Sequence, residues 1–209
     1  MGSEMCIRDR TWTAPGTPVT EEQGADVAAV LAWLPAGDRA LFERLLWDRT
    51  PLVDALRLSP RTLIHGDLDD RNLGLRPVFT RNECNEPAAG LSELVLIDWE
   101  WMGLGTPALD VARLWATFPA VCDPAQPCPE AAFSTELLDY YLDRYHAYGG
   151  RQIDPRSWRR ECALAMLAHA FSQVRFIGSV LRDDPLAVRP TIERQLGLVL
   201  EAARSLPAA

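Results

Sequence analysis

One short segment concentrates acidic and amide side chains between two apolar runs. Residues 65–72 have the sequence HGDLDDRN, in which three carboxylates and one amide lie within six positions. Such crowding is electrostatically costly unless a cation lies among the oxygen atoms. We expect an apolar strand to end at His65, a turn to present Asp67, and Asn72 to lead into the next strand. The segment therefore predicts a site that combines a proton acceptor with oxygen ligands for a hard cation.

A second pair of carboxylates follows another apolar run. Leu94–Ile97 is apolar, and Asp98 and Glu100 come directly after it. If the strands before and after these residues are neighbours, Asp98 converges with Asp67 and Asn72. An amide and a carboxylate suit Mg²⁺, which prefers oxygen ligands. Asp67 would then remain to accept a proton.

Short strands and longer helices must position these residues. The apolar runs at residues 62–64, 73–75 and 94–97 predict short strands of a small sheet, and residues 76–93 a long hairpin loop. Helices are predicted over most of the first 60 residues, where Asp38 is expected to cap the second one. Later helices are predicted at residues 108–118, 134–148, 154–179 (capped by Asp154) and 191–206. The fold class predicted is α+β, mostly helical.

The composition limits the compartments and partners that we expect. The chain has 209 residues and a formal net charge of −8, which disfavours nucleic acid. It has no uninterrupted apolar run of about 18 residues, so we expect no membrane span and a cytoplasmic protein. All 21 basic residues are arginine, which excludes lysine chemistry. Five irregularly spaced cysteines indicate neither a zinc site nor a disulfide framework, although Cys122 and Cys128 flank one loop and could pair.

The chain is expected to form one domain after a short leader. Residues 1–12 have neither a signal-peptide pattern nor a helical period, so we assign them to a leader outside the fold. Residues 13–209 form the domain. Cys162 and His169 lie in an apolar helical stretch and are predicted to be core residues.

Three ordered motifs resemble the aminoglycoside phosphotransferase and choline kinase-like family, which has the protein-kinase fold. They span residues 62–112: the sequence HGDLDDRN at residues 65–72, IDWE at residues 97–100, and GTPALDVA at residues 105–112. By this resemblance the chain is the helical C-terminal lobe of such an enzyme. The implied reaction moves the γ-phosphate of ATP or GTP to a hydroxyl of a small molecule.

The resemblance also implies a role for each matching residue. Asp67 is the base that orients the acceptor hydroxyl, and Asn72 and Asp98 hold Mg²⁺ and through it the nucleotide. Asp110 would brace the backbone of the loop, and His65 would support it. The acidic residues around the motif suit a cationic acceptor such as an aminoglycoside; they are Asp69, Asp70, Glu100 and Asp123.

The chain departs from the family pattern on the N-terminal side. The residues before His65 contain no GxGxxG sequence and no lysine, so the family's N-terminal β lobe, which covers the nucleotide, is not recognised. We therefore expect a fragment that is inactive as an isolated lobe. The interval between Asn72 and Asp98 is longer than a compact hairpin, which indicates an insertion at residues 76–93.

Two other functions remain open at this stage. A kinase-like lobe without turnover would bind Mg²⁺, a partner or a small ligand. The sequence GLGTPA at residues 103–108 follows an apolar strand and resembles a dinucleotide-binding turn, although Pro107 interrupts it. Trp99 and Trp101 are predicted to lie on opposite sides of a strand end, one packed inward and one facing a cleft.

Overall fold

The structure is a computed structural model that describes residues 21–77, 80–81, 87–88, 92–117, 135–183 and 199–206. The predicted leader, the predicted Cys122–Cys128 pair and residues 191–198 of the last predicted helix lie outside these residues, as does Asp123. Within the described residues the chain is mostly helical with a small β region, so the α+β class is confirmed.

The helices lie close to their predicted positions. Residues 199–204 are also helical. The labelled helices are α2 (Glu21–Trp33), α3 (Ala36–Trp47), α4 (Thr50–Arg57), α5 (Ala108–Thr117), α6 (Thr135–Ala147) and α7 (Pro155–Asp183).

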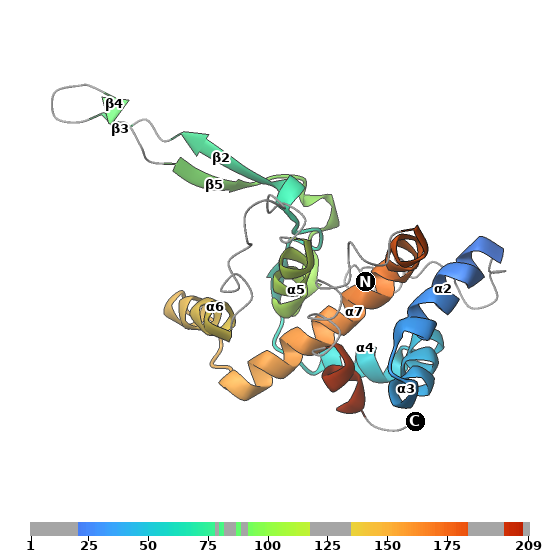
Figure 1. Ribbon diagram of the computed structural model, residues 1–209. Helices are drawn as coiled ribbons and strands as arrows, with labels where there is room; N and C mark the ends of the chain where they lie inside the picture. Colours follow the sequence, from blue (N-terminus) through green and yellow to red (C-terminus); the bar gives the residue numbers. More distant parts are fainter. Residues whose placement is uncertain are drawn as a thin grey trace.

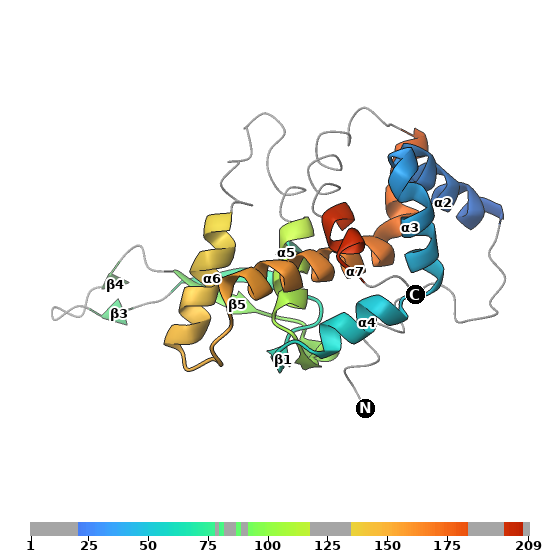
Figure 2. The same ribbon diagram turned by 90° about the horizontal axis from the view of Figure 1, so that it is seen from below.

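Helix α7 is the central element of the helical body. It runs through the body in Figures 1 and 2, with α6 near its first turns and α2 near its last turns, and it contacts α2, α4, α5 and α6. Its start follows the predicted capping pattern, because Oδ2 of Asp154 accepts a hydrogen bond from the Ser157 N–H at 2.9 Å. Pro155 occupies the first helical position, where its missing N–H costs no hydrogen bond.

By length and composition alone, α7 is apolar enough to cross a membrane. Its most apolar 18-residue window has a mean hydropathy of 1.3, and 44% of that window is buried inside the protein. This apolarity is used for packing against the other helices.

The side chains of α7 form the centre of the core. Phe171 packs against Phe42 of α3 with ring centroids 4.8 Å apart. Trp158 is fully buried, stacks on Tyr141 of α6, and donates from Nε1 to the Leu138 carbonyl at 2.8 Å. Cys162 is also fully buried, as predicted, and burial raises the pKa of its thiol well above its usual range.

The prediction that Asp38 caps the second helix is wrong. Helix α3 begins at Ala36, and Asp38 lies inside its first turn. There it accepts hydrogen bonds from Arg204, whose Nε lies 2.7 Å from Oδ1. The Arg204 hydrogen bond holds the pKa of Asp38 below its usual value. The aspartate thus joins α3 to the C-terminal helical residues 199–204.

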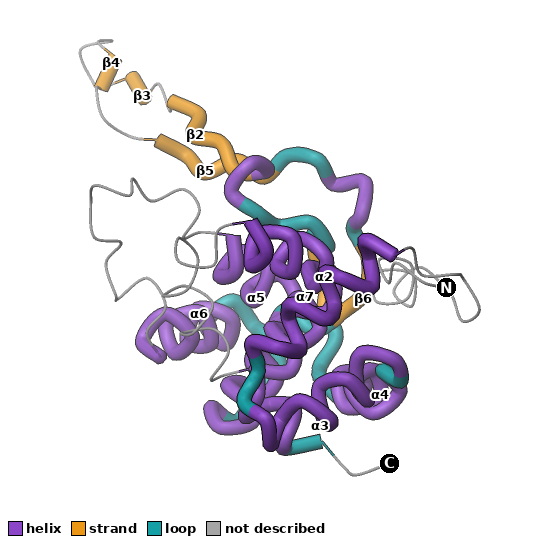
Figure 3. Tube along the Cα trace, turned by 45° about the vertical axis from the view of Figure 1, so that its right-hand side comes forward, coloured by secondary structure: helices purple, strands orange, loops and turns teal. Residues whose placement is uncertain are grey.

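The β region consists of two-stranded antiparallel pairs among the described residues. β1 (Thr62–Ile64) pairs with β6 (Gly103–Gly105), β2 (Leu73–Pro77) with β5 (Ser92–Leu96), and β3 (Thr80–Arg81) with β4 (Pro87–Ala88). The predicted strands are confirmed as elements, and the hairpin formed by β2 and β5 projects away from the helices in Figure 3. β6 was not predicted from the sequence, nor were β3 and β4, which lie within residues 76–93 where a hairpin loop was predicted.

The pairing of β6 also removes the dinucleotide-binding interpretation. Gly103–Gly105 forms an extended strand opposite Thr62–Ile64. A dinucleotide turn would instead have to curve from a parallel strand into a helix that receives the pyrophosphate. These glycines therefore serve strand pairing.

Candidate functional site

The candidate site is the segment of residues 65–72, which connects β1 to β2. β1 is held on one side by β6, and the segment closes with a 3₁₀ turn, η1 (Asp70–Asn72), that leads directly into β2. A second 3₁₀ turn, η2 (Trp99–Trp101), lies between β5 and β6. The two strand pairs therefore bring residues 65–72 and residues 97–101 together.

Gly66 lets the segment lie directly against η2. Its φ is +79°, and a Cβ atom at this position would lie 2.3 Å from the carbonyl oxygen of Trp101. Residues with a side chain rarely adopt this backbone conformation, and real Cβ atoms do not approach a carbonyl so closely. Only glycine fits this close contact.

Asp110, in the first turn of α5, anchors the start of the segment. Its Oδ2 accepts a hydrogen bond from the His65 N–H at 2.7 Å, and its Oδ1 accepts one from the Gly66 N–H at 2.9 Å. Burial raises the pKa of Asp110, although these N–H donors act to lower it. One carboxylate thus fixes two successive peptide groups of the site.

His65 is buried, and the hydrogen bonds of its ring fit one neutral tautomer. Its Nε2 lies 2.8 Å from the Ile97 carbonyl oxygen, and its Nδ1 lies 3.3 Å from the Asp67 backbone nitrogen. A carbonyl requires a donor and a backbone N–H requires an acceptor, so the proton belongs on Nε2. His65 therefore ties the backbone before Asp98 to that of Asp67.

Asp67 and Asn72 are in direct contact. The Asn72 Nδ2 donates to the Asp67 backbone carbonyl at 2.7 Å and to Oδ2 of Asp67 at 3.2 Å. The other carboxylate oxygen of Asp67 forms an ion pair with Arg113 of α5. The Asp67 side chain is only 15% exposed, so this ion pair is partly shielded from water.

The Asp69 carboxylate forms ion pairs with two arginines. Its side chain is fully buried; Arg71 Nη2 lies 2.6 Å and Arg113 Nη2 lies 3.3 Å from Oδ2. Burial acts to raise its pKa, but hydrogen bonds from the two arginines outweigh burial and hold the pKa below its usual value. Sequence reasoning missed Arg113, although it lies three residues after Asp110 and so near the same face of α5.

Asp98 lies between the end of β5 and the 3₁₀ turn η2. The N–H of Ile97, the preceding residue, donates to the Asn72 carbonyl at 3.1 Å. Asp98 has φ 63° and ψ 60°, and in the described part of the chain no other residue except glycine has a positive φ. Such backbone outliers concentrate at functional sites. Its side chain is exposed.

The prediction that Trp99 and Trp101 lie on opposite sides of a strand end is wrong. Both belong to the 3₁₀ turn η2, and both are substantially exposed. The Trp99 ring lies 4.6 Å from the His65 ring, centroid to centroid, and its Nε1 donates to the Leu96 carbonyl at 3.0 Å. Trp99 therefore covers His65.

The side chains of Asn72 and Asp98 have the chemistry of a Mg²⁺ site. Because Nδ2 of Asn72 is engaged with Asp67, its Oδ1 is the atom that can face a cation, and Asp98 adds an exposed carboxylate. Mg²⁺ is usually held by one or two such oxygen ligands, completed by water and phosphate. Among the described residues, no cluster of three or more His, Cys, Asp and Glu side chains could hold a metal on its own.

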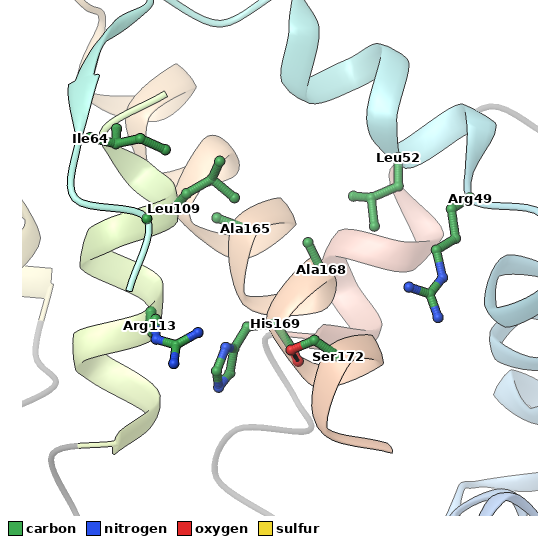
Figure 4. A pocket seen from close by; sticks show the side chains of 10 residues that line it. Arg49, Leu52, Ile64, Leu109, Arg113, Ala165, Ala168, His169 and Ser172 are labelled. Atoms are coloured by element: carbon green, nitrogen blue, oxygen red, sulfur yellow. Dashed lines mark hydrogen bonds between the residues drawn. The ribbon is translucent and has the colours of Figure 1, made fainter. Parts of the chain in front are cut away.

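A cavity of about 80 Å³ lies beside the segment of residues 65–72, and Figure 4 shows its lining. His169 of α7 lines this cavity instead of lying in the core as predicted. The described lining residues come from α4, α5, α7 and the end of β1; they are Arg49, Leu52, Ile64, Gly66, Leu109, Arg113, Ala165, Ala168, His169 and Ser172.

Comparison of the chain with models of known protein families, with curated proteins and with solved structures finds no match.

Proposed function

We propose that this chain is the catalytic lobe of a small-molecule phosphotransferase with a protein-kinase-like fold. The reaction would move the γ-phosphate of ATP or GTP to the hydroxyl of a small acceptor. The observation that supports this proposal best is the arrangement around Asp67: Asn72 contacts it directly, and the backbone of Ile97, the residue before Asp98, makes hydrogen bonds with His65 and Asn72.

The family resemblance implies a role in this reaction for each residue, and the contacts are compatible with these roles. Asp67 would accept a hydrogen bond from the acceptor hydroxyl and take its proton as the phosphoryl group is transferred. Asn72 and Asp98 would hold Mg²⁺, which neutralises charge on the nucleotide phosphates. His65 and Asp110 are positioning residues, because they fix the backbone that carries Asp67.

Metal–nucleotide binding tests the proposal on the chain itself. Mn²⁺ is titrated into the protein, into ATP and into their mixture, and free Mn²⁺ is measured by electron paramagnetic resonance. Because ATP itself chelates Mn²⁺, ATP-dependent binding is the Mn²⁺ bound in the mixture beyond the sum for the two components. We expect ATP-dependent Mn²⁺ binding, and we expect Asp98→Asn to weaken it by at least about 10-fold, or 1.4 kcal/mol. Glu100→Gln is the matched control, because it removes an exposed carboxylate two residues away.

Asp67 separates binding from chemistry. Asp67→Asn should change the Mn²⁺–ATP affinity by no more than about 2-fold. In a catalytically active form of the enzyme, the same substitution should lower kcat by about 10²- to 10⁴-fold. Equal affinities for Asp98→Asn and Glu100→Gln, or no ATP-dependent Mn²⁺ binding at all, would overturn the proposal.

One pair of contacts favours a second candidate, a kinase-like binding module without turnover. Arg113 forms an ion pair with Oδ1 of Asp67 and Asn72 donates to Oδ2, so both carboxylate oxygens already have partners within the protein. The two candidates differ in one measurement: a module binds Mn²⁺–ATP but releases no ADP in the presence of any hydroxyl acceptor.

A further inference from the structure

The cavity beside residues 65–72 has a cationic side. Of its ten described lining residues, none is acidic, two are arginines and one is a histidine. In Figure 4, Arg113 points toward His169, while Arg49 and Ser172 lie across the cavity; the remaining labelled side chains are apolar. The lining thus combines an apolar wall with positively charged and hydrogen-bonding groups. A polar ligand with negative charge would match it.

Among the described residues that line the cavity, Arg49 has no carboxylate partner. It is partly buried, and its guanidinium lies 5.3 Å from the centre of the Phe171 ring. Its Nε donates to the Leu46 carbonyl at 3.4 Å, but no carboxylate among the described residues pairs with it. Burial lowers the pKa of Arg49 to about 10, so it still carries its charge at neutral pH. A buried charge without a counterion is costly, and a bound anion would remove that cost.

Arg113 connects this cavity to Asp67. Its guanidinium lines the cavity and at the same time pairs with the carboxylates of Asp67 and Asp69. Gly66, the residue before Asp67, lines the cavity too. A small molecule held here would therefore lie next to the proposed base.

We propose that this cavity binds the anionic group, a carboxylate or a phosphate, of the acceptor whose hydroxyl Asp67 receives. This inference rests on the proposed function and names its substrate class. A cavity of about 80 Å³ has room for a small polar group, since one water needs only about 10–15 Å³. It differs from the cationic acceptor expected from the sequence; of the acidic residues behind that expectation, Asp69 is buried in ion pairs and Glu100 is exposed, and neither lines the cavity.

Binding of three related probes tests the charge preference without nucleotide or metal. Glycerate, glycerol 3-phosphate and glycerol share hydroxyl groups, and only the first two are anionic. Isothermal titration calorimetry should show binding of at least one of the two anions and none of glycerol. The stronger of the two distinguishes a carboxylate-binding from a phosphate-binding cavity.

Variants locate the bound anion. Arg49→Gln should weaken anion binding by at least about 10-fold, and Arg49→Lys should restore part of it. Arg151→Gln is the matched control, because Arg151 is exposed and lies outside the cavity. Urea titration shows whether each variant is folded. Ser172→Asp is an independent test, because it adds a negative charge to the lining and should abolish anion binding by repulsion.

The outcomes separate this inference from the proposed function. Equal anion affinities for Arg49→Gln and Arg151→Gln, unchanged binding in Ser172→Asp, or binding of glycerol as tight as that of glycerate would overturn the inference. Because no nucleotide is present, the Mn²⁺–ATP result for Asp98→Asn is independent of it. If the anions bind but Mn²⁺–ATP does not, the anion-binding role of the cavity stands and only the proposed phosphotransferase function is refuted.

Discussion

Replacing Gly66 by alanine tests the close contact between the two segments of the site. The new Cβ would lie 2.3 Å from the Trp101 carbonyl oxygen, and both neighbouring atoms, the Trp101 carbonyl carbon and Cβ, are within 3.3 Å. A positive φ costs alanine about 1–2 kcal/mol. Forcing a methyl group against a packed backbone adds about 1–3 kcal/mol. Gly66→Ala should therefore lower the free energy of unfolding by about 2–5 kcal/mol.

Urea denaturation followed by circular dichroism measures this loss. With a typical slope of about 2 kcal/mol per molar urea, the midpoint should fall by about 1–2.5 M. Gly37→Ala is the matched control. Gly37 lies in α3, and no atom outside its own helix backbone lies within 4 Å of the position of an added Cβ atom. Alanine should therefore stabilise the helix by about 0.5–1 kcal/mol. A Gly66→Ala protein as stable as the parent chain would refute the close contact described for this loop.

Two further predictions concern ion pairs and hydrogen bonds outside the cavity. Asp110→Asn leaves one of the two backbone N–H donors without an acceptor, so it should lower the free energy of unfolding, measured in urea, by about 1–3 kcal/mol. The exposed control Asp54→Asn should change it by less than about 0.5 kcal/mol. Similar losses for both variants would contradict the anchoring role of Asp110. Because the pKa of Asp38 is lowered in the folded state, its contribution to stability is present above the ordinary Asp value of 3.8 and is lost as the pH falls through the folded value. The difference in free energy of unfolding between the parent chain and Arg204→Gln should therefore shrink as the pH falls below 3.8. A difference that stays constant down to acid unfolding would count against the Asp38–Arg204 ion pair.

The sequence predicted those elements whose signals are local. Asp154 and Pro155 mark the start of α7, and the apolar runs around residues 73–75 and 94–97 mark the two strands of the hairpin. β6 escaped prediction because Gly-Leu-Gly has no alternation of apolar and polar residues; its extended form depends on pairing with β1.

The features that were missed depend on partners far away in the chain. Asp38 looks like a helix cap until Arg204, 166 positions later, pairs with it. His169 lies in an apolar helical stretch that is typical of a core, and only the packing of α4, α5 and α7 shows that it lines a cavity. The proximity of Asp67 to Asn72 could be anticipated, since only four residues separate them.

The anchoring of His65 and Gly66 by Asp110 also has a consequence for how the protein acquires its shape. These hydrogen bonds join positions 45 and 44 residues apart, so a long stretch of chain must close before they form. A synthetic peptide of residues 62–77 would contain Asp67 and Asn72 with the hydrogen bonds between them, but it would lack Asp110 and the strands β5 and β6 that fix this segment in the protein. The local arrangement is thus inherited from the assembled helices, and it would be absent from any excised piece that lacks α5.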